Sequence, residues 1–379
     1  MRELSTVGSG LEPDTASVDA RFMALALTLG RRGLGRTWPN PAVGAVIVKD
    51  GVIVGRGWTQ PGGRPHAEVE ALRRAGPLAR GATLYVTLEP CSHFGRSPPC
   101  ADAVIAAGIV RVVSALEDPN PEVAGAGHAR LRAAGIAVDI GVGAEEARHA
   151  HAGHIRRMRD GRPHVLLKLA VSADGKVGAA GRKPLAITGE DARERVQLLR
   201  AQSDAIMVGS GTALADDPIL TCRLPGMTGY SPVRVVLDAR LRLPLGSRLV
   251  HSAREVPLWV VAAADAPPTA KKILEAAGVT VLAVPRGGAG LDLTAVLRLL
   301  AERGISRLMV EAGPILAAAL LHADLVDEAA LFRSDRRVGA DGIDALEGLP
   351  LTALTQSPRL TTVSGEAVGA DRVEILQRR

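Results

Sequence analysis

The chain lacks several features that mark whole classes of protein. Aromatic residues make up only 2% of its 379 residues, whereas proteins that bind single-stranded nucleic acid normally stack bases on aromatic side chains. The sequence contains no uninterrupted run of about 18 apolar residues, so a membrane-spanning helix is not expected. The N-terminal segment is polar and has no apolar stretch of the kind found in secretion signals. These absences argue against nucleic-acid, membrane and secreted proteins.

Cysteine is scarce as well, with three residues in all. Three cysteines cannot form a disulfide framework, so we expect a reducing compartment, the cytoplasm. The dinucleotide fingerprint G-x-G-x-x-G is missing, which excludes the usual Rossmann signature. The net charge of +6 comes from arginines scattered along predicted helices, a distribution that suits small phosphorylated ligands as well as nucleic acid.

One compact group of reactive side chains stands against these absences: His66, Glu68, Cys91 and Cys100. One imidazole and two thiolates leave a tetrahedral Zn²⁺ an open position for water. Zinc lowers the pKa of that water to about 7, and Glu68 would then carry protons. The order matches the H-x-E…P-C-x-x-C signature of zinc deaminases, although eight residues separate the cysteines here. A closed structural site would need a fourth ligand, for which His93 is the nearby candidate; we favour the open, catalytic site.

The first part of the chain alternates helices and strands. We expect a helix over 19–33, two strands joined by a hairpin at Lys49-Asp50-Gly51, and a helix from His66 to Ala75. Further strands and helices follow, with Cys100 in a helix that starts with proline and ends with glycine. This order predicts a mixed sheet with helices on both faces, and it places the zinc residues where helices begin at the carboxyl edge of the sheet.

The pattern breaks between about 144 and 163, where His149, His151 and His154 lie in a charged segment. No cysteine or carboxylate complements these histidines, so we interpret the segment as a solvated helix leading into a linker. A second α/β series then begins with a strand over 164–172. The expected organisation is a loose tail over 1–18, one domain over 19–146, a linker over 147–163, and a second domain over 164–379.

Longer motifs give the chain a family resemblance. In the first half they are P-N-P-A-V-G (39–44), P-H-A-E (65–68), T-L-E-P-C-S-H-F-G-R-S-P-P-C (87–100) and D-P-N-P-E-V-A-G-A-G (118–127). In the second half they are K-L-A-V-S-A-D-G-K (168–176), L-L-R-A-Q-S-D-A (198–205), T-A-L-A-D-D-P-I-L-T-C-R (212–223) and V-E-A-G-P-I-L (310–316). The chain strongly resembles the bacterial bifunctional deaminase–reductases of riboflavin biosynthesis. The eight-residue gap between the cysteines is that family's form of the motif.

The resemblance implies an N-terminal cytidine-deaminase-like three-layer α/β/α domain and a C-terminal dihydrofolate-reductase-like α/β domain. It implies two consecutive reactions: zinc-dependent hydrolytic deamination of a phosphorylated diaminopyrimidinone ribosylamine, then NADPH-dependent reduction of the ribosyl group to ribityl. The cofactors would be one Zn²⁺ per chain and NADPH. The partner would be this small phosphorylated pyrimidine, with no nucleic acid or membrane; homo-oligomer formation is left open.

The resemblance also implies roles for individual residues. His66, Cys91 and Cys100 would bind zinc, and Glu68 would be the catalytic proton carrier. Substrate-binding positions would be Asn40, Lys168, Pro184, Arg200, Leu220, Arg223 and Glu311. Arg200 and Arg223 would hold the phosphate, because a guanidinium offers a planar, charged fork of donors. Cofactor-binding positions would be Ala170, Ala186, Thr212, Asp216, Gly313, Pro314, Ile315 and Leu316.

Three departures from the family pattern lie in the reductase half. Pro184 replaces a substrate-binding serine, Ala186 replaces an aromatic residue beside the cofactor, and residues 331–343 lack an expected proline-containing segment. A deaminase with a degenerate, structural reductase domain is therefore the main alternative. A nucleic-acid-binding zinc protein is a third candidate, and the steep salt dependence of phosphate-driven binding would reveal it.

Overall fold

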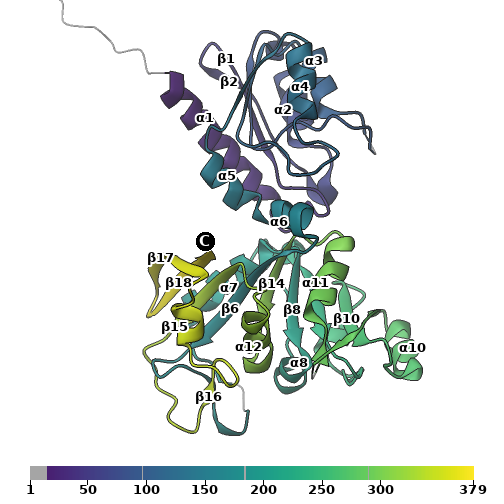
Figure 1. The fold of residues 1–379 in the computed structure, drawn as a ribbon, viewed down its shortest axis with the longest axis vertical. Coiled ribbons are helices and arrows are strands. Elements are labelled where there is room, and N and C mark those ends of the chain that lie inside the picture. The colour runs from purple at the N-terminus through teal and green to yellow at the C-terminus, as the bar shows by residue number, and fades with distance from the viewer. Residues whose placement is uncertain (1–14, 96, 183–184, 289) are drawn as a thin grey trace, which may run out of the picture. The chain divides into compact units, whose positions relative to one another are not determined.

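The computed structural model describes residues 15–95, 97–182, 185–288 and 290–379, which fall into two compact units (Figure 1). The first unit comprises the N-terminal helix with the residues up to Gly33, Ala42–Gln60 and Arg64–His151. The second comprises Leu34–Pro41, Pro61–Gly63 and Ala152–Arg379. The division after His151 falls within the segment that we expected to be a linker.

The first unit is built on a five-stranded sheet with the order β2-β1-β3-β4-β5. Strand β1 is antiparallel to β2 and β3, whereas β3, β4 and β5 are parallel. The strands are β1 (Gly44–Lys49), β2 (Val52–Trp58), β3 (Thr83–Val86), β4 (Arg111–Ser114) and β5 (Ala137–Ile140). The helices are α1 (Thr15–Gly30), α2 (Ala67–Ala75), α3 (Cys100–Ala106), α4 (Ala126–Ala133) and α5 (Ala144–Ala150), with 3-10 turns at Arg31–Gly33 and Gly76–Ala79.

Helices cover both faces of this sheet. On one face, Ala71 of α2, Val104 of α3 and Leu131 of α4 belong to one buried cluster. On the other face, Phe22 of α1 and Ala147 of α5 belong to a second cluster. Each helix therefore buries an apolar stripe against the sheet, which is the reason for its amphipathic pattern. The predicted three-layer α/β/α arrangement is confirmed.

The hairpin between β1 and β2 forms where the sequence predicts it. Asp50 and Gly51 have φ angles of 50° and 76°, and Lys49 pairs with Val52. Two consecutive left-handed residues are the requirement of a type I′ turn, which aspartate and glycine tolerate well. The turn fixes the register of β2 beside β1, the strand that precedes the zinc segments.

The second unit is built on a nine-stranded sheet with the order β11-β10-β9-β8-β14-β6-β15-β18-β17. All neighbours from β11 to β15 are parallel, and the β17–β18 hairpin is added antiparallel to β15. Its strands are β6 (His164–Val171), β8 (Ala205–Gly209), β9 (Val233–Leu237), β10 (Leu258–Ala263), β11 (Thr280–Val284), β14 (Arg307–Glu311), β15 (Glu328–Arg333), β17 (Leu360–Val368) and β18 (Asp371–Arg378). Two-stranded pairs are formed by β7 (Lys176–Gly178) with β16 (Ile343–Asp344) and by β12 (Arg286–Gly287) with β13 (Gly290–Leu291).

Helices lie on both faces of the large sheet as well. They are α6 (Ala152–Asp160), α7 (Glu190–Ala201), α8 (Ser210–Asp216), α9 (Arg248–His251), α10 (Pro268–Ala276), α11 (Leu293–Glu302), α12 (Pro314–His322) and α13 (Thr352–Thr355), with 3-10 turns at Pro61–Gly63, Ala180–Arg182 and Thr228–Tyr230. Helices α11 and α12 pack on one face, where Leu300 and Leu320 are fully buried. Helix α7 packs on the other face through Ala192 and Val196. None of the helices in the described part of the chain has the length and apolar character needed to cross a membrane.

The ends of the first unit differ from the expectation. Helix α1 begins at Thr15, so residues 15–18 are helical instead of part of a loose tail. The reason is that Val18 packs against the cluster beneath α1, which adds a turn to the helix. Residues 1–14, the rest of the expected tail, lie outside the described residues.

The expected linker over 147–163 is largely helical, because α5 extends to Ala150 and α6 covers Ala152–Asp160. The interpretation of this stretch as solvated is wrong for His151 and His154, which are both buried. His151 Nε2 lies 3.0 Å from Thr87 Oγ1. A polar contact inside the unit therefore accounts for this histidine.

Candidate active sites

The structure brings His66, Cys91 and Cys100 together. His66 is the residue before α2, Cys91 lies in the loop after β3, and Cys100 is the first residue of α3. The His66 Nδ1 atom lies 3.2 Å from Cys100 Sγ and 3.7 Å from Cys91 Sγ. The three ligand atoms all lie within 4.8 Å of one another. Two helix starts and the loop after β3 thus supply one imidazole and two sulfur atoms to a single point.

These residues fit a zinc ion. Zinc–ligand bonds of about 2.0–2.3 Å in a tetrahedron place neighbouring ligand atoms roughly 3.5 Å apart, close to the observed separations. A hydrogen bond from the Cys100 thiol, against the opposing effect of burial, lowers the pKa of the Cys91 thiol, and bonds from His66 and the Cys100 amide add to this effect. A thiolate is the form of cysteine that binds metal.

The fourth position of this group has no protein ligand among the described residues. His93, considered as the residue that would close a structural site, is exposed and does not belong to the ligand group. A three-ligand arrangement is typical of catalytic zinc, because water or substrate takes the remaining position.

Glu68 follows His66 by two residues in α2 and is only 3% exposed. Burial raises the pKa of Glu68 to about 7, while the nearby His66 opposes the increase. A carboxyl group that titrates near neutral pH can both accept and release a proton during turnover. The environment of Glu68 therefore suits a proton carrier beside the three ligands.

Asn40, predicted to orient the pyrimidine, belongs to the second unit by its contacts. Its Nδ2 atom donates a hydrogen bond of 2.9 Å to the carbonyl of Gly63. Gly63 has a φ of 84°, and a Cβ there would lie 2.8 Å from Asn40 Cβ. Only glycine leaves room for Asn40 in this arrangement.

In the second unit, the structure brings Lys168, Arg200 and Glu311 together. Lys168 of β6 and Glu311 of β14 are direct partners in the sheet register. Arg200, near the end of α7, donates two hydrogen bonds of 2.6 and 3.0 Å to the two oxygens of Glu311. Burial raises the pKa of Glu311, but the charge and hydrogen bonds of Arg200, together with Lys168, lower it below its usual value. Glu311 is therefore a carboxylate that is already paired.

The two arginines predicted to hold the substrate phosphate differ sharply. A third bond of Arg200, 3.1 Å from Nη1 to the carbonyl of Thr221, fixes its guanidinium further. Arg223 is exposed, and within the described residues its guanidinium has no hydrogen bond or ion pair. Its backbone amide donates to Gln197 Oε1 at 2.9 Å, which anchors the residue. Arg223 is the more accessible cation of the two.

Leu220 has a left-handed backbone, with a φ of 59°. Its side chain is 2% exposed and lies in the cluster that also contains Ile206 and Val236. A buried side chain is not available to a ligand, so any contact from this residue must come from its backbone.

The positions predicted for the cofactor lie at the carboxyl ends of β8 and β14. Thr212 is in α8, and Gly313 precedes α12, whose first residues are Pro314, Ile315 and Leu316. A Cβ at Gly313 would lie 3.0 Å from Thr212 Oγ1, so the two segments are neighbours. Free amides at the start of α12 can bind phosphate oxygens.

The remaining predicted cofactor positions are less closely grouped. Asp216 ends α8, and burial raises its pKa. Ala170 lies on β6. Ala186 is exposed, and its carbonyl accepts a hydrogen bond of 3.0 Å from Arg336 Nη1. Arg336 belongs to the atypical segment 331–343, so two of the three departures from the family pattern meet here. The third, Pro184, lies outside the described residues.

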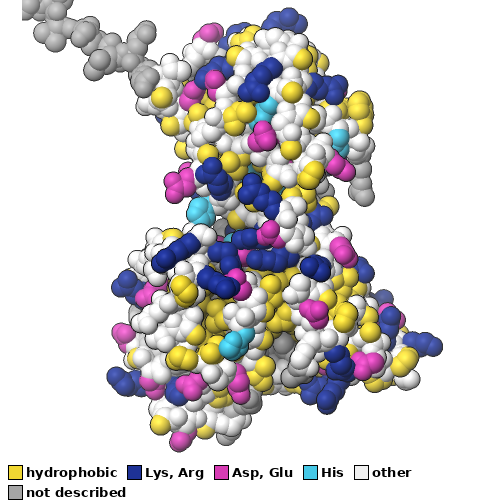
Figure 2. All heavy atoms as spheres, viewed as in Figure 1, with side chains coloured by type: hydrophobic (Ala, Val, Ile, Leu, Met, Phe, Trp, Pro, Cys, Tyr) yellow, Lys and Arg dark blue, Asp and Glu magenta, His cyan; other side chains and the backbone are white. Residues whose placement is uncertain are grey.

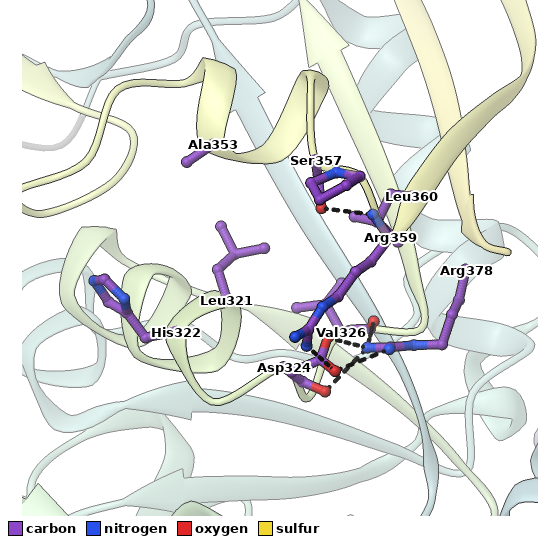
Figure 3. Close-up of a pocket in the computed structure, with 10 residues that line it drawn as sticks. Leu321, His322, Asp324, Val326, Ala353, Ser357, Arg359, Leu360 and Arg378 are labelled. Carbon is purple, nitrogen blue, oxygen red and sulfur yellow. Dashed lines mark hydrogen bonds and ion pairs between the residues drawn. The ribbon is translucent and has the colours of Figure 1, made fainter.

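A pocket of about 240 Å³ lies elsewhere in the second unit (Figure 3). It is lined by the end of α12, by the segment before β17, and by Arg378 of β18. Asp324 lies in it and forms ion pairs with Arg359 and Arg378. These three charges satisfy one another, and none of the predicted site residues lines the pocket. We assign it no ligand.

Charges of both signs are mixed on the visible face of each unit. Figure 2 shows acidic and basic side chains interspersed on the visible face of each unit, with a denser group of Lys and Arg on the second. Many arginines of that unit are in ion pairs, among them Arg162 with Asp327 at 2.6 Å. Paired arginines contribute little to the attraction of a phosphate backbone.

Comparisons with known proteins agree with this division into two sites. A family described as the cytidine and deoxycytidylate deaminase zinc-binding region matches residues 16–116. A family described as the RibD C-terminal domain matches residues 163–373. Among curated proteins, the chain is 44% identical over 370 residues to the riboflavin biosynthesis protein RibD of Escherichia coli, covering 93% of this chain and 97% of that protein. The RibD of Aquifex aeolicus is 40% identical, with 95% and 99% covered.

Solved structures give the same result. Acinetobacter baumannii RibD superposes with a TM-score of 0.86 at 36% identity, covering 96% of this chain and 99% of that one. A diaminohydroxyphosphoribosylaminopyrimidine deaminase/5-amino-6-(5-phosphoribosylamino)uracil reductase of Thermotoga maritima superposes with a TM-score of 0.83 at 34% identity, covering 97% and 100%. The likeness therefore extends over both units.

Proposed function

The chain belongs to the RibD family of riboflavin-biosynthesis deaminase–reductases, and we propose that residues 19–146 carry the deamination and residues 164–379 the reduction. The two consecutive steps are hydrolytic removal of an amino group from the pyrimidine and reduction of its ribosyl group to ribityl. Zinc and NADPH are the cofactors of these two activities. The assignment of individual residues to each step follows from the contacts described above.

For the deamination, His66, Cys91 and Cys100 would hold one zinc ion per chain, which when bound activates water for attack on the pyrimidine carbon. Glu68 would accept a proton from the attacking water and deliver it to the departing amino group, which leaves as ammonia. Its burial supports this role, because a carboxyl group with a pKa near 7 can make both transfers at neutral pH. Asn40 would orient the pyrimidine.

For the reduction, NADPH when bound supplies the hydride that reduces the sugar carbon. Arg223 would bind the substrate phosphate, since its guanidinium is exposed and has no partner among the described residues. Arg200 would orient Glu311 and add a remaining donor to the substrate. Lys168 would face the sugar, and Leu220 would contact the substrate through its backbone. The cofactor would be held by Ala170, Ala186, Thr212, Asp216, Gly313, Pro314, Ile315 and Leu316. Pro184, the remaining expected substrate position, lies outside the described residues.

The convergence of one histidine and two cysteines on a single point, without a fourth protein ligand among the described residues, is the observation that best supports the deaminase half. Elemental analysis of the purified protein tests it: we expect about one zinc per chain. Active protein without zinc would overturn this assignment.

A deaminase with an inactive reductase domain is the second candidate, favoured by Ala186 and by the atypical segment that contacts it through Arg336. Oxidation of NADPH with the deaminated substrate separates the two candidates. We expect turnover, because the paired Glu311, the open Arg223 and the Gly313 segment leave the rest of the reductase site intact.

We also propose that the enzyme acts in the cytoplasm, as its cysteine content favours a reducing compartment, and that its partners are small molecules instead of nucleic acid or membrane. Unchanged mobility in a gel-shift titration at low salt is the expected result. Binding that weakens steeply with salt would contradict it.

A further inference from the structure

Glu89, two residues before Cys91, is buried, and each of its carboxylate oxygens accepts two hydrogen bonds. It is 4% exposed. Oxygen Oε1 accepts from the backbone amides of Gly127 and His128 at 2.8 and 3.1 Å. Oxygen Oε2 accepts from the amides of Asp118 and Gly125 at 3.1 and 2.9 Å. Four charge-assisted bonds use about all the acceptor sites of one carboxylate, so the charge of Glu89 is fully compensated by this one set of amides.

All four amides belong to one segment, residues 118–128, which leads from β4 into α4. Two of them lie in the first turn of α4, where amides have no partner within the helix. The negative charge of Glu89 also complements the positive end of the helix dipole. Glu89 therefore caps α4 from a distant part of the chain and fixes the segment before it.

Glycine makes this close approach possible. A Cβ at Gly127 would lie 2.0 Å from the carbonyl oxygen of Pro90 and 3.1 Å from Glu89 Oε1. Gly125 has a φ of 78°, in the region that favours glycine. The segment thus lies directly against the loop that carries Cys91.

A second metal site does not explain this arrangement. Glu89, Glu117 and His128 have ligand atoms close enough to suggest one. The four N–H groups point at the oxygens of Glu89, however, and these donors would repel a cation.

Arg130, which follows this segment in α4, makes two contacts beside the two cysteines. Arg130 of α4 donates from Nη1 to the carbonyl of Ser92 at 3.3 Å, next to Cys91. The same arginine forms an ion pair of 2.6 Å with Asp102 of α3, two residues after Cys100. Helix α4, which continues segment 118–128, is therefore bound to residues next to both sulfur ligands.

We propose that Glu89 is a positioning residue for deamination, which holds segment 118–128 against the cysteine loop so that the segment forms one wall of the pyrimidine site. The proposal rests on the proposed function of the zinc triad. The carboxyl edges of the parallel strands β3 and β4 face the same side of the sheet, where ligands of α/β sheets bind. Glu89 acts through the backbone and touches no reacting atom.

Glu89→Gln tests the proposal in the full-length, zinc-loaded protein. Glutamine keeps the shape of glutamate and one acceptor oxygen. Its NH₂ group must then face two of the backbone amides, and because both groups donate, those hydrogen bonds are lost. We expect the zinc content to stay at the wild-type level and the KM for deamination to rise by about 10–100-fold, the usual effect of losing an outer support of a metal site. We expect kcat to change less than KM, and NADPH oxidation to stay unchanged. Glu117→Gln is the matched control, because the exposed Glu117 accepts none of these amides, and should behave as wild type.

Gly127→Ala tests the same contact from the other side and remains informative if Glu89→Gln does not fold. The added methyl group must push the segment away from Pro90, so the same increase in KM is expected. An unchanged KM in both variants would overturn the proposal. It would also be overturned if the variants lost zinc and their kcat fell in proportion to the zinc lost while KM stayed constant. If wild-type protein itself fails to deaminate, the proposed function fails, which is a separate outcome.

Discussion

The two sites of this chain are assembled in opposite ways. The candidate zinc triad of His66, Cys91 and Cys100 comes from two helix starts and the loop after β3, within a short stretch of sequence, and no fourth protein ligand joins it among the described residues. The candidate reductase site draws on β6, α7, β14 and the segment around Arg223, and two of its charges neutralise each other in the Arg200–Glu311 pair. Within the candidate reductase site, Arg200 is paired with Glu311, whereas the guanidinium of Arg223 has no hydrogen bond or ion pair among the described residues. A paired arginine supports the site, whereas an open one can receive the ligand.

The largest effect should come from Cys91→Ser, because serine is a poor zinc ligand and removes one of three. We expect loss of zinc and of measurable deamination, while NADPH oxidation with the deaminated substrate continues. Elemental analysis and the two activity assays measure this. Cys222→Ser is the matched control: Cys222 is buried in the other unit and its replacement should leave the zinc content unchanged. Loss of both activities in Cys91→Ser would show that the sites are not separate.

Glu68→Gln separates proton transfer from metal binding. The amide cannot carry a proton, so deamination should fall by about 10²–10⁴-fold or more, while zinc stays bound. Glu70→Gln serves as the control, since Glu70 lies in the same helix but pairs with Arg73 at 3.0 Å. Near-normal turnover of Glu68→Gln would place the proton carrier elsewhere.

Arg200→Ala should reveal a mainly structural cost. It leaves the carboxylate of Glu311 buried without its partner, and breaking such a pair typically costs about 3–5 kcal/mol. We expect a clear decrease in the urea midpoint at which NADPH binding is lost, with deamination unaffected under native conditions. An unchanged midpoint would contradict the view that this pair holds the site together.

Arg223→Ala should show the complementary behaviour. Loss of a hydrogen bond to a charged group costs about 1.5–3 kcal/mol, so the KM of the reductase should rise by about 10–150-fold. Stability should change little, because the side chain makes no hydrogen bond or ion pair within the described residues. A variant with normal KM would mean that the phosphate binds elsewhere.

The sequence was sufficient to predict that His66, Cys91 and Cys100 lie together, and to predict most elements around them. His66 and Cys100 lie at helix starts that proline and glycine mark locally, and the hairpin at Asp50-Gly51 follows from two residues alone. The α/β order of both units could be predicted for the same reason. Periodicity and turn residues act over a few positions.

Other features depend on residues that are far apart in the chain. The Arg200–Glu311 pair joins residues 111 positions apart. No local sequence pattern indicates which arginine pairs with Glu311. Glu89 stood in the motif T-L-E-P-C, yet its four amide partners lie 29–39 positions away. The C-terminal hairpin of β17 and β18 has no clear signal in the sequence, because β17 is exposed over most of its length and lacks the apolar alternation of a half-buried strand.

Selective removal of zinc from the wild-type protein, followed by both activity assays on the same preparation, tests most directly that the chain contains two independently assembled sites. We predict that deamination is lost and returns when zinc is added, while NADPH oxidation with the deaminated substrate stays at the untreated rate. Deamination that survives without zinc, or absence of NADPH oxidation before treatment, would contradict this account.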